Sequence, residues 1–336
     1  MNFKKYTAAI MVGSILLSGC SSNSSNIRKE DGKDIVASLT DKDVFADDIL
    51  NQLLDTNVGK TAYYNAVLEE LINTKFPVDE AMRIDADMIV KNTEAHYKAN
   101  FRENADAQLE AYLASNQWND LNDFRDAIIK SLQNVRFLEH YVNENYEEVF
   151  NDYYAYATPR ILSVIKVSMI NVESPTEEES AKLEEVNALV HTSKDFNEIA
   201  SEYSDDQETK RHDGRLGVVD TTTDLSSFGK EVADIALSLE DGEISEPIQG
   251  TGGYYILKCN SNKEDDIKSR IKNLGIDSPL LSYDSFLSFI AFNSYTLTYE
   301  SEEAEQIINE VINKALEQRE EGRREKEQDD ESGETE

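Results

Sequence analysis

The stretch YSDDQETKRHDGRLG, residues 203–217, holds the residue types in this 336-residue chain whose spacing could do chemistry. A tyrosine and a serine precede two adjacent carboxylates, Asp205 and Asp206, and a charged loop then leads to a Gly-x-Leu-Gly turn. A carboxylate can accept hydrogen bonds or transfer a proton, and His212 could supply an imidazole to the same loop. We therefore ask whether this loop forms part of an active site.

The motifs of other common chemistries are missing from the sequence. It contains no P-loop, no Gly-x-Gly-x-x-Gly, no Gly-x-Ser-x-Gly and no EF-hand loop. The histidines have no His-x-x-x-His spacing, and no Cys-x-x-Cys pair is present. We therefore expect no metal site and no cofactor. The dispersed histidines are His96, His140, His191 and His212.

The N-terminal sequence MNFKKYTAAIMVGSILLSGC combines two lysines, a short apolar run and the tetrapeptide LSGC. This pattern predicts a secretory signal peptide over residues 1–19, followed by a lipid-modified Cys20. The apolar run is shorter than the roughly 20 residues that a membrane-spanning helix needs. Residues 20–34 are polar and predict a flexible tether. An uncleaved anchor helix or an ordinary signal peptide is the alternative, and each possibility places the chain outside the cytoplasm.

The second cysteine, Cys259, lies in an apolar run. A lipid-modified Cys20 could not pair with it, so the sequence predicts no disulfide framework. A cysteine in such a run is typical of a buried structural thiol.

The chain is strongly acidic, with 67 acidic against 33 basic residues and a net charge of -34. This charge repels phosphate backbones, so we expect no nucleic-acid partner. We interpret the charge mainly as a source of solubility. Binding of cationic clients or of divalent cations is the alternative.

The spacing of apolar residues predicts helices in both flanks of the chain. Apolar residues recur at helical spacing over residues 35–157, including a long helix at 79–101. Helical spacing returns over 263–316, and this segment needs an apolar partner surface, for which the N-terminal region is the candidate. Residues 317–336 are highly charged without an apolar stripe and predict a disordered acidic tail.

The middle of the chain has a different periodicity. The β-branched run at 161–170 predicts a strand, residues 177–190 predict a helix, and 252–260 predict a closing strand. The predicted fold class is therefore α+β. A helical, chaperone-like domain built from the N- and C-terminal segments is interrupted by a small α/β domain over residues 158–262.

Four stretches of this small domain resemble, in order and spacing, a parvulin-type peptidyl-prolyl isomerase. With the lipobox and the helical flanks, the whole chain resembles the PrsA-type extracytoplasmic foldase lipoproteins. The resemblance implies a membrane-anchored foldase that binds unfolded or partly folded secreted proteins and isomerises prolyl bonds without a cofactor; a homodimer is also possible. The stretches are DFNEIASEYSDD (195–206), GRLG (214–217), ALSLEDGEISEPI (236–248) and GGYYILK (252–258).

The resemblance also implies the positions of the catalytic residues. The family places a histidine in the first strand, an acidic residue or cysteine after the Tyr-Ser turn, and a histidine in the closing strand. The corresponding residues here are Ser163, Asp206 (Asp205 if the alignment shifts by one) and Tyr255. Hydroxyl groups can form hydrogen bonds but cannot reproduce a pair of imidazoles. Residual catalysis and an inactive, retained fold are therefore both open.

The residues of this chain that correspond to the family's proline pocket also differ from the family pattern. Its methionine and phenylalanine positions fall on Phe228 and Val232, and the smaller Val232 would hold a proline ring more loosely.

Three functions fit the sequence. The first is a foldase that both binds and isomerises clients, and the second is a non-catalytic holdase with a degenerate isomerase domain. The third, from another class, is a solute-binding or wall-structural lipoprotein. For client binding we consider four aromatic residues of the helical region, although aromatic residues at helical spacing more often form the core. They are Trp118, Phe124, Tyr112 and Phe101.

Overall fold

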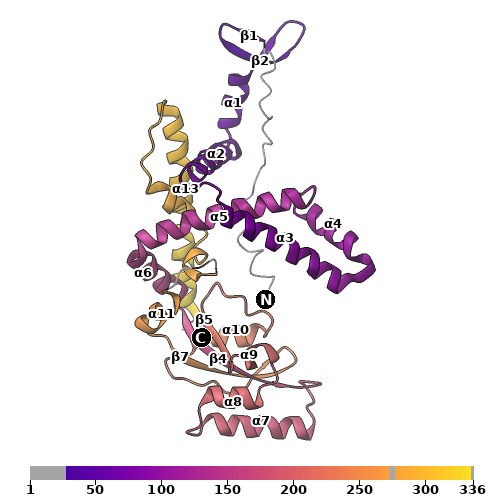
Figure 1. The fold of residues 1–336 in the computed structure, drawn as a ribbon. Coiled ribbons are helices and arrows are strands. Elements are labelled where there is room, and N and C mark those ends of the chain that lie inside the picture. Colours follow the sequence, from indigo (N-terminus) through magenta and orange to yellow (C-terminus); the bar gives the residue numbers. More distant parts are fainter. Residues whose placement is uncertain (1–27, 273–274, 276, 334–336) are drawn as a thin grey trace. The chain divides into compact units, whose positions relative to one another are not determined.

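The computed structural model describes residues 28–272, 275 and 277–333, so the predicted signal peptide and Cys20 lie outside the described residues. The chain divides into two compact units (Figure 1). Unit 1 combines the chain up to Tyr141 with the chain from Ser285, and unit 2 comprises Val142–Asp284. Both units combine helices with a sheet, which confirms the α+β class and its interrupted helical domain.

Unit 1 begins with a small sheet and continues as helices. Its N-terminal elements are β1 (Lys29–Glu30), β2 (Lys33–Ser38), β3 (Asp43–Phe45), α1 (Ala46–Leu54), α2 (Asn57–Lys75), α3 (Glu80–Phe101), α4 (Ala105–Ser115) and α5 (Leu121–Glu144), whose last residues pass into unit 2. Its C-terminal helices are α12 (Leu287–Asn293) and α13 (Glu302–Gly333).

Capping residues explain where the helices of unit 1 begin. The Thr56 side chain accepts a hydrogen bond from the Gly59 N–H at the start of α2, and Asp79 accepts one from Met82 at the start of α3. Such caps satisfy N–H groups that a helix leaves unpaired in its first turn. The helix predicted at 79–101 is confirmed by α3.

Three sequence-based expectations for the ends of the chain are wrong. Residues 28–34, expected to belong to a flexible tether, form β1 and the start of β2, which are joined by a turn where Asp31 and Gly32 adopt positive φ angles. Residues 35–45, expected to be helical, are mostly β2 and β3, which pair antiparallel. Residues 317–333, expected to be disordered, continue α13. Glutamate, glutamine, lysine and arginine are good helix formers, so a helix needs no apolar stripe once the preceding turns are packed.

The N- and C-terminal segments of unit 1 meet at Tyr64. Its ring centroid lies 4.9 Å from that of Phe289 and 5.0 Å from that of Phe292, and all three belong to one helical core. Lys60 and Glu310 add an ion pair of 2.6 Å between α2 and α13. The C-terminal helices therefore pack on the N-terminal region through aromatic contacts.

The Tyr64 hydroxyl is buried without a hydrogen-bond partner in the described part of the chain. Because an unpaired buried hydroxyl is costly, Tyr64→Phe is expected to raise the stability of unit 1 by about 1 kcal/mol. Burial also raises the pKa of Tyr64 above its usual value of 10.0, so the folded state retains this proton while the unfolded state loses it. Stability that is present below pH 10 is therefore lost as pH rises above it.

Hydrogen exchange of the α2 amides at pH 7 and at alkaline pH measures both effects. Tyr64→Phe should slow exchange at pH 7 and should reduce the loss of stability at alkaline pH. Faster exchange in the variant at pH 7 would show that the hydroxyl is satisfied.

Unit 2 contains a four-stranded antiparallel sheet in the order β5-β4-β7-β6. The strands are β4 (Arg160–Ser168), β5 (Arg215–Val219), β6 (Ile248–Gly250) and β7 (Gly253–Ser261). The strands predicted at 161–170 and 252–260 are confirmed as β4 and β7, and the helix predicted at 177–190 is confirmed as α7.

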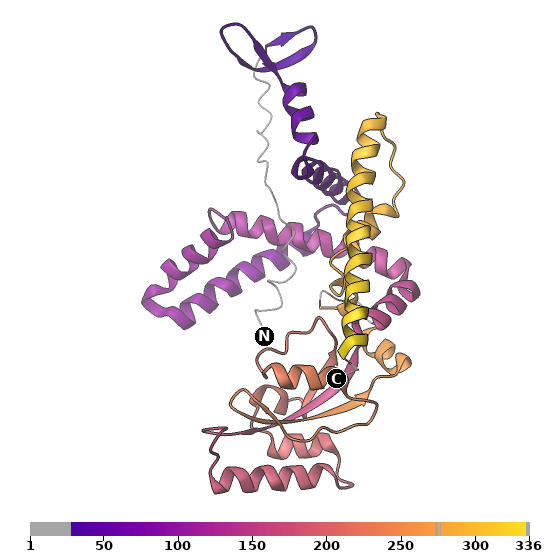
Figure 2. The same cartoon turned by 180° about the vertical axis from the view of Figure 1, so that it is seen from behind.

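Helices cover both faces of this sheet (Figures 1 and 2). Helices α7 (Glu177–Val190) and α8 (Phe196–Tyr203) pack on one face, and α10 (Lys230–Ser238) packs on the other. Cys259 is fully buried on the α10 face, where burial raises the pKa of its thiol, so its predicted burial is confirmed.

Unit 2 extends beyond the boundaries predicted for the small domain. Helix α6 (Tyr146–Ala157) and residues 263–284 belong to it, although we assigned them to the helical domain. The cause is a set of buried contacts, among them hydrogen bonds from the Tyr153 hydroxyl to Asp220 and from the Tyr154 hydroxyl to the carbonyl of Asn262. Within the described ranges, no helix is long and apolar enough to cross a bilayer.

Candidate functional site

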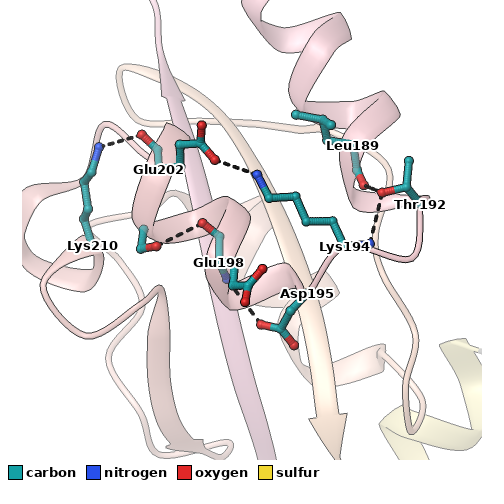
Figure 3. A network of polar contacts seen from close by, with 8 residues as sticks. Leu189, Thr192, Lys194, Asp195, Glu198, Glu202 and Lys210 are labelled. Carbon is teal, nitrogen blue, oxygen red and sulfur yellow. Dashed lines mark hydrogen bonds and ion pairs between the residues drawn. The ribbon is translucent and has the colours of Figure 1, made fainter.

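Helix α8, which leads into the Tyr-Ser-Asp-Asp loop, is fixed at both ends (Figure 3). At its start, Asp195 accepts hydrogen bonds from the N–H groups of Asn197 and Glu198 at 2.9 and 3.2 Å. At its end, Lys194 forms an ion pair of 2.5 Å with Glu202, whose carbonyl accepts a hydrogen bond from Lys210. The helix therefore holds the loop in one position.

The loop itself is attached to β4. The Asp205 N–H donates to the Lys166 carbonyl at 2.8 Å, and its carboxylate accepts from the Ser168 N–H at 2.9 Å and pairs with Lys182 at 2.7 Å. The buried hydroxyl of Ser204 accepts from the Lys166 N–H at 3.2 Å. The first aspartate of the pair therefore has a structural role.

The Asp206 carboxylate caps a short helix, α9 (Gln207–Lys210). It accepts hydrogen bonds from the Thr209 hydroxyl at 2.6 Å and from the Glu208 N–H at 3.3 Å. Asp206 is half-buried, and His212 in the same loop is exposed. The acidic position kept from the family pattern therefore already has hydrogen-bond donors within the fold.

Tyr255 lies in β7 with only 1% of its surface exposed. Its hydroxyl donates to the Thr251 carbonyl at 2.8 Å, and its ring lies edge-to-face with Phe228 at 5.4 Å. The Lys166 ammonium lies 5.2 Å from the ring centroid, within the range of a cation–π interaction. Gly250 packs against the same ring, since a Cβ there would lie 2.7 Å from it.

Ser163 lies on the opposite face of the sheet from Tyr255. Side chains alternate along a strand, and its neighbours Leu162 and Val164 are in the core cluster that contains Tyr255. Ser163 is fully buried, and its hydroxyl accepts a hydrogen bond from Asn260 at 2.9 Å. The β4 residues that share the face of Tyr255 include Leu162, Val164 and Lys166, so the two predicted hydroxyl groups are not brought together.

The two predicted pocket residues do lie in the cluster of Tyr255. Phe228 is partly exposed, whereas Val232 is 1% exposed on the buried side of α10 and is part of the core. Sequence reasoning missed Lys166, which touches both the acidic loop through its backbone and Tyr255 through its ammonium. The alternation of β4 could have indicated it, because Lys166 is a charged residue at a position that faces the core cluster.

The aromatic residues considered for client binding mostly form the core of the α3–α5 region. Trp118 lies 4.8 Å from Phe124, and Tyr112 lies within 6.0 Å of both rings. Phe124 is 4% exposed, whereas Phe101 at the end of α3 is 40% exposed. Of the four, Phe101 is the residue most accessible to a partner.

Comparison with known proteins identifies the class of unit 2. Residues 163–261 match the family model of the PPIC-type PPIASE domain, named Rotamase. The sheet, the acidic loop and α10 therefore belong to a parvulin-type peptidyl-prolyl isomerase domain.

Relatives along the whole chain extend the assignment. The foldase protein PrsA 2 of Bacillus anthracis is 26% identical over 79% of this chain and 81% of that protein. The foldase protein PrsA of Staphylococcus epidermidis is 24% identical over 92% of this chain and 91% of that protein. The crystal structure of the foldase protein PrsA from Streptococcus pneumoniae has 17% identity and a TM-score of 0.36, covering 82% of this chain and 99% of that one. The chain is therefore similar to PrsA foldases over most of its length.

Proposed function

We propose that this chain is an extracytoplasmic foldase, attached to the cell membrane through a lipid on Cys20, that assists secreted proteins mainly by binding them. In this proposal its PPIC-type domain contributes a folded surface and little isomerisation. The observation that supports it is the separate engagement of the three polar candidates, Ser163, Asp206 and Tyr255, each in a hydrogen bond within the fold.

The physical requirements of prolyl isomerisation explain why this observation matters. Rotation about the prolyl bond crosses a barrier of about 20 kcal/mol, and an enzyme lowers it by binding the twisted amide better than the planar one. Polar groups that stabilise the twisted amide must reach it from the pocket wall. Ser163 and Tyr255 are 0% and 1% exposed, and Val164 offers no hydrogen-bonding group on the face of Tyr255.

Residual isomerisation is the second candidate function, and one observation favours it. The Lys166 ammonium lies over the Tyr255 ring, close to the partly exposed Phe228, so a cation is present beside an aromatic surface. A cation there could polarise a bound carbonyl group.

The test uses the soluble chain beginning at Ser21 and a refolding protein whose slow step is prolyl isomerisation, which takes tens of seconds or longer. We expect substoichiometric amounts to leave this slow step unchanged, whereas equimolar amounts suppress aggregation of the same protein. Both activities would be measured in one preparation.

Asp206→Asn and Asp206→Ala are the matched variants. Asparagine keeps an oxygen acceptor at the helix cap but removes the carboxylate charge, whereas alanine removes both. Neither should change aggregation suppression. A clear acceleration by the unmodified chain that Asp206→Asn abolishes, with the circular dichroism unchanged, would contradict the proposal and identify the loop as an active site.

A further inference from the structure

Exposed apolar side chains are concentrated at the start of unit 1, in residues 28–58, which we call the N-terminal lobe. This segment contains β1, β2, β3, α1 and the first residues of α2. Six large apolar side chains of the lobe are between 40% and 65% exposed: Val36, Leu39, Ile49, Leu50, Leu53 and Val58. An exposed apolar cluster of this kind is typical of an interaction surface.

Helix α1 is amphipathic, and its apolar side is uncovered. Ile49, Leu50 and Leu53 lie on one side of the helix, Asp47 lies at the edge of this side, and Asp48 lies on the opposite side. The three apolar residues are 40–48% exposed, and α1 has no buried residue in the described part of the chain. Folding of unit 1 has therefore left an apolar helix face available to something outside it.

The position of Cys20 in the sequence restricts what this lobe can meet. Cys20 precedes Arg28 by eight residues. Eight residues span at most about 29 Å, whatever their conformation. This argument rests on the lipid attachment proposed above, and if that attachment holds, Arg28, where the lobe begins, lies within about one bilayer thickness of the membrane surface.

The charge of the lobe is divided between its two parts. Residues 28–42 carry four basic residues (Arg28, Lys29, Lys33, Lys42) and four acidic residues (Glu30, Asp31, Asp34, Asp41), so this part is neutral. Residues 43–58 carry four acidic residues (Asp43, Asp47, Asp48, Asp55) and no basic residue, so the lobe as a whole has a net charge of -4. Because anionic lipids repel acidic surfaces, the neutral part can approach a lipid surface most closely, and contact by α1 depends on its apolar side.

We propose that the N-terminal lobe lies on the lipid surface, with the apolar side of α1 and the exposed residues of β2 and the following turn in the interfacial layer. Amphipathic helices bind membranes in this orientation by burying their apolar side among the acyl chains near the head groups. The lipid on Cys20 supplies proximity, and the lobe supplies a second, weaker contact that fixes the orientation of the attached end of unit 1.

The test places an environment-sensitive fluorophore on Leu53→Cys and, as a control, on Met88→Cys. Met88 is equally apolar and 52% exposed but lies on α3, outside the lobe. One arm uses the full lipidated chain in vesicles of phosphatidylglycerol and phosphatidylcholine that contain spin-labelled lipid. The other arm uses the chain from Ser21 tethered by an N-terminal histidine tag to nickel-chelating lipid, which makes it independent of lipidation. The unsubstituted chain measures background labelling of the buried Cys259.

We expect the label at position 53 to be blue-shifted and quenched by spin-labelled lipid several-fold more than the label at position 88. Adding Ile49→Gln and Leu50→Gln should remove most of this quenching, whereas Asp47→Asn and Asp48→Asn should not.

Equal quenching at the two positions would overturn the proposal. A blue shift without lipid quenching that grows with protein density would also overturn it and would assign the lobe to a second copy of the chain. Failure of the lipidated chain to float with vesicles would instead refute the lipid attachment, and the tethered arm would still decide the proposal.

Discussion

Replacing Asp220 with alanine is expected to destabilise unit 2 by about 3 kcal/mol, because it removes a buried carboxylate that accepts four hydrogen bonds and leaves the buried Tyr153 hydroxyl unpaired. Asp220 directly follows β5 and is 2% exposed. Its carboxylate accepts hydrogen bonds from the Tyr153 hydroxyl at 2.8 Å, from the N–H and hydroxyl of Thr222 at 2.8 and 2.7 Å, and from the Thr223 hydroxyl at 3.1 Å.

Two variants separate the contributions to this network. Asp220→Asn keeps one oxygen acceptor and should cost less than the alanine substitution. Tyr153→Phe removes a single donor and should cost about 1 kcal/mol. Burial, and then the charge of Asp220, raises the pKa of Tyr153, so at neutral pH this residue acts as a neutral donor.

Hydrogen exchange of β4 and β7 in the full chain measures these losses without assuming that both units unfold together. Circular dichroism of each variant would show that it still folds. Exchange in Asp220→Ala at the rate of the unsubstituted chain would contradict the expectation and would mean that water replaces the carboxylate.

The same hydrogen bond shows why the domain boundary could not be predicted from the sequence. Val149, Phe150 and Tyr153 are buried at helical spacing in α6, a pattern that fits a helix of either unit. What assigns α6 to unit 2 is Asp220, 67 residues further along the chain. Periodicity identifies a helix and its buried side, but it contains no information about the partner of that side.

The candidate site, too, could be predicted from the sequence only in part. The strands β4 and β7 and the helix that precedes the acidic loop were predictable from local patterns. The Gly-x-Leu-Gly stretch, expected to be a turn, lies mostly in β5, and β6 was not predicted. The face of the sheet on which a strand residue lies could not be predicted, because an error of one residue in the alignment moves every side chain to the other face. Alignment selected Ser163, whereas the structure places its neighbours Val164 and Leu162 beside Tyr255.

The hydrogen bonds of the candidate residues were even harder to predict from the sequence than the faces of the strands. An aspartate after a Tyr-Ser turn looks the same whether it caps a helix or faces a substrate. Asp206 accepts a hydrogen bond from the Thr209 hydroxyl, and Tyr255 donates one to the Thr251 carbonyl. Each partner is within four residues in the sequence, yet only the backbone conformation brings the two groups into contact. The proposal that this domain contributes little isomerisation therefore rests on geometry.

Replacing Gly214 with alanine is expected to destabilise unit 2 by about 3 kcal/mol or more, because positive φ and close packing act together. Gly214 has a φ of 74° and ends the acidic loop, and its carbonyl accepts a hydrogen bond from the Val164 N–H at 2.8 Å. A Cβ there would lie 2.5 Å from the Cβ of Ala200 and 2.7 Å from the Val164 carbonyl oxygen. Neither atom belongs to a flexible side chain, so α8 or β4 would have to move.

Gly217, three residues later in β5, is the matched control. Its φ is 87°, but a Cβ there would meet no atom within 4 Å. Gly217→Ala should therefore cost only the strain of a positive φ, about 1–2 kcal/mol. Hydrogen exchange of α8 and β5 in the full chain compares the two variants. Equal losses would show that the loop does not approach β4 as closely as described, whereas a larger loss for Gly214→Ala would establish that the acidic loop is retained as part of the core of this domain.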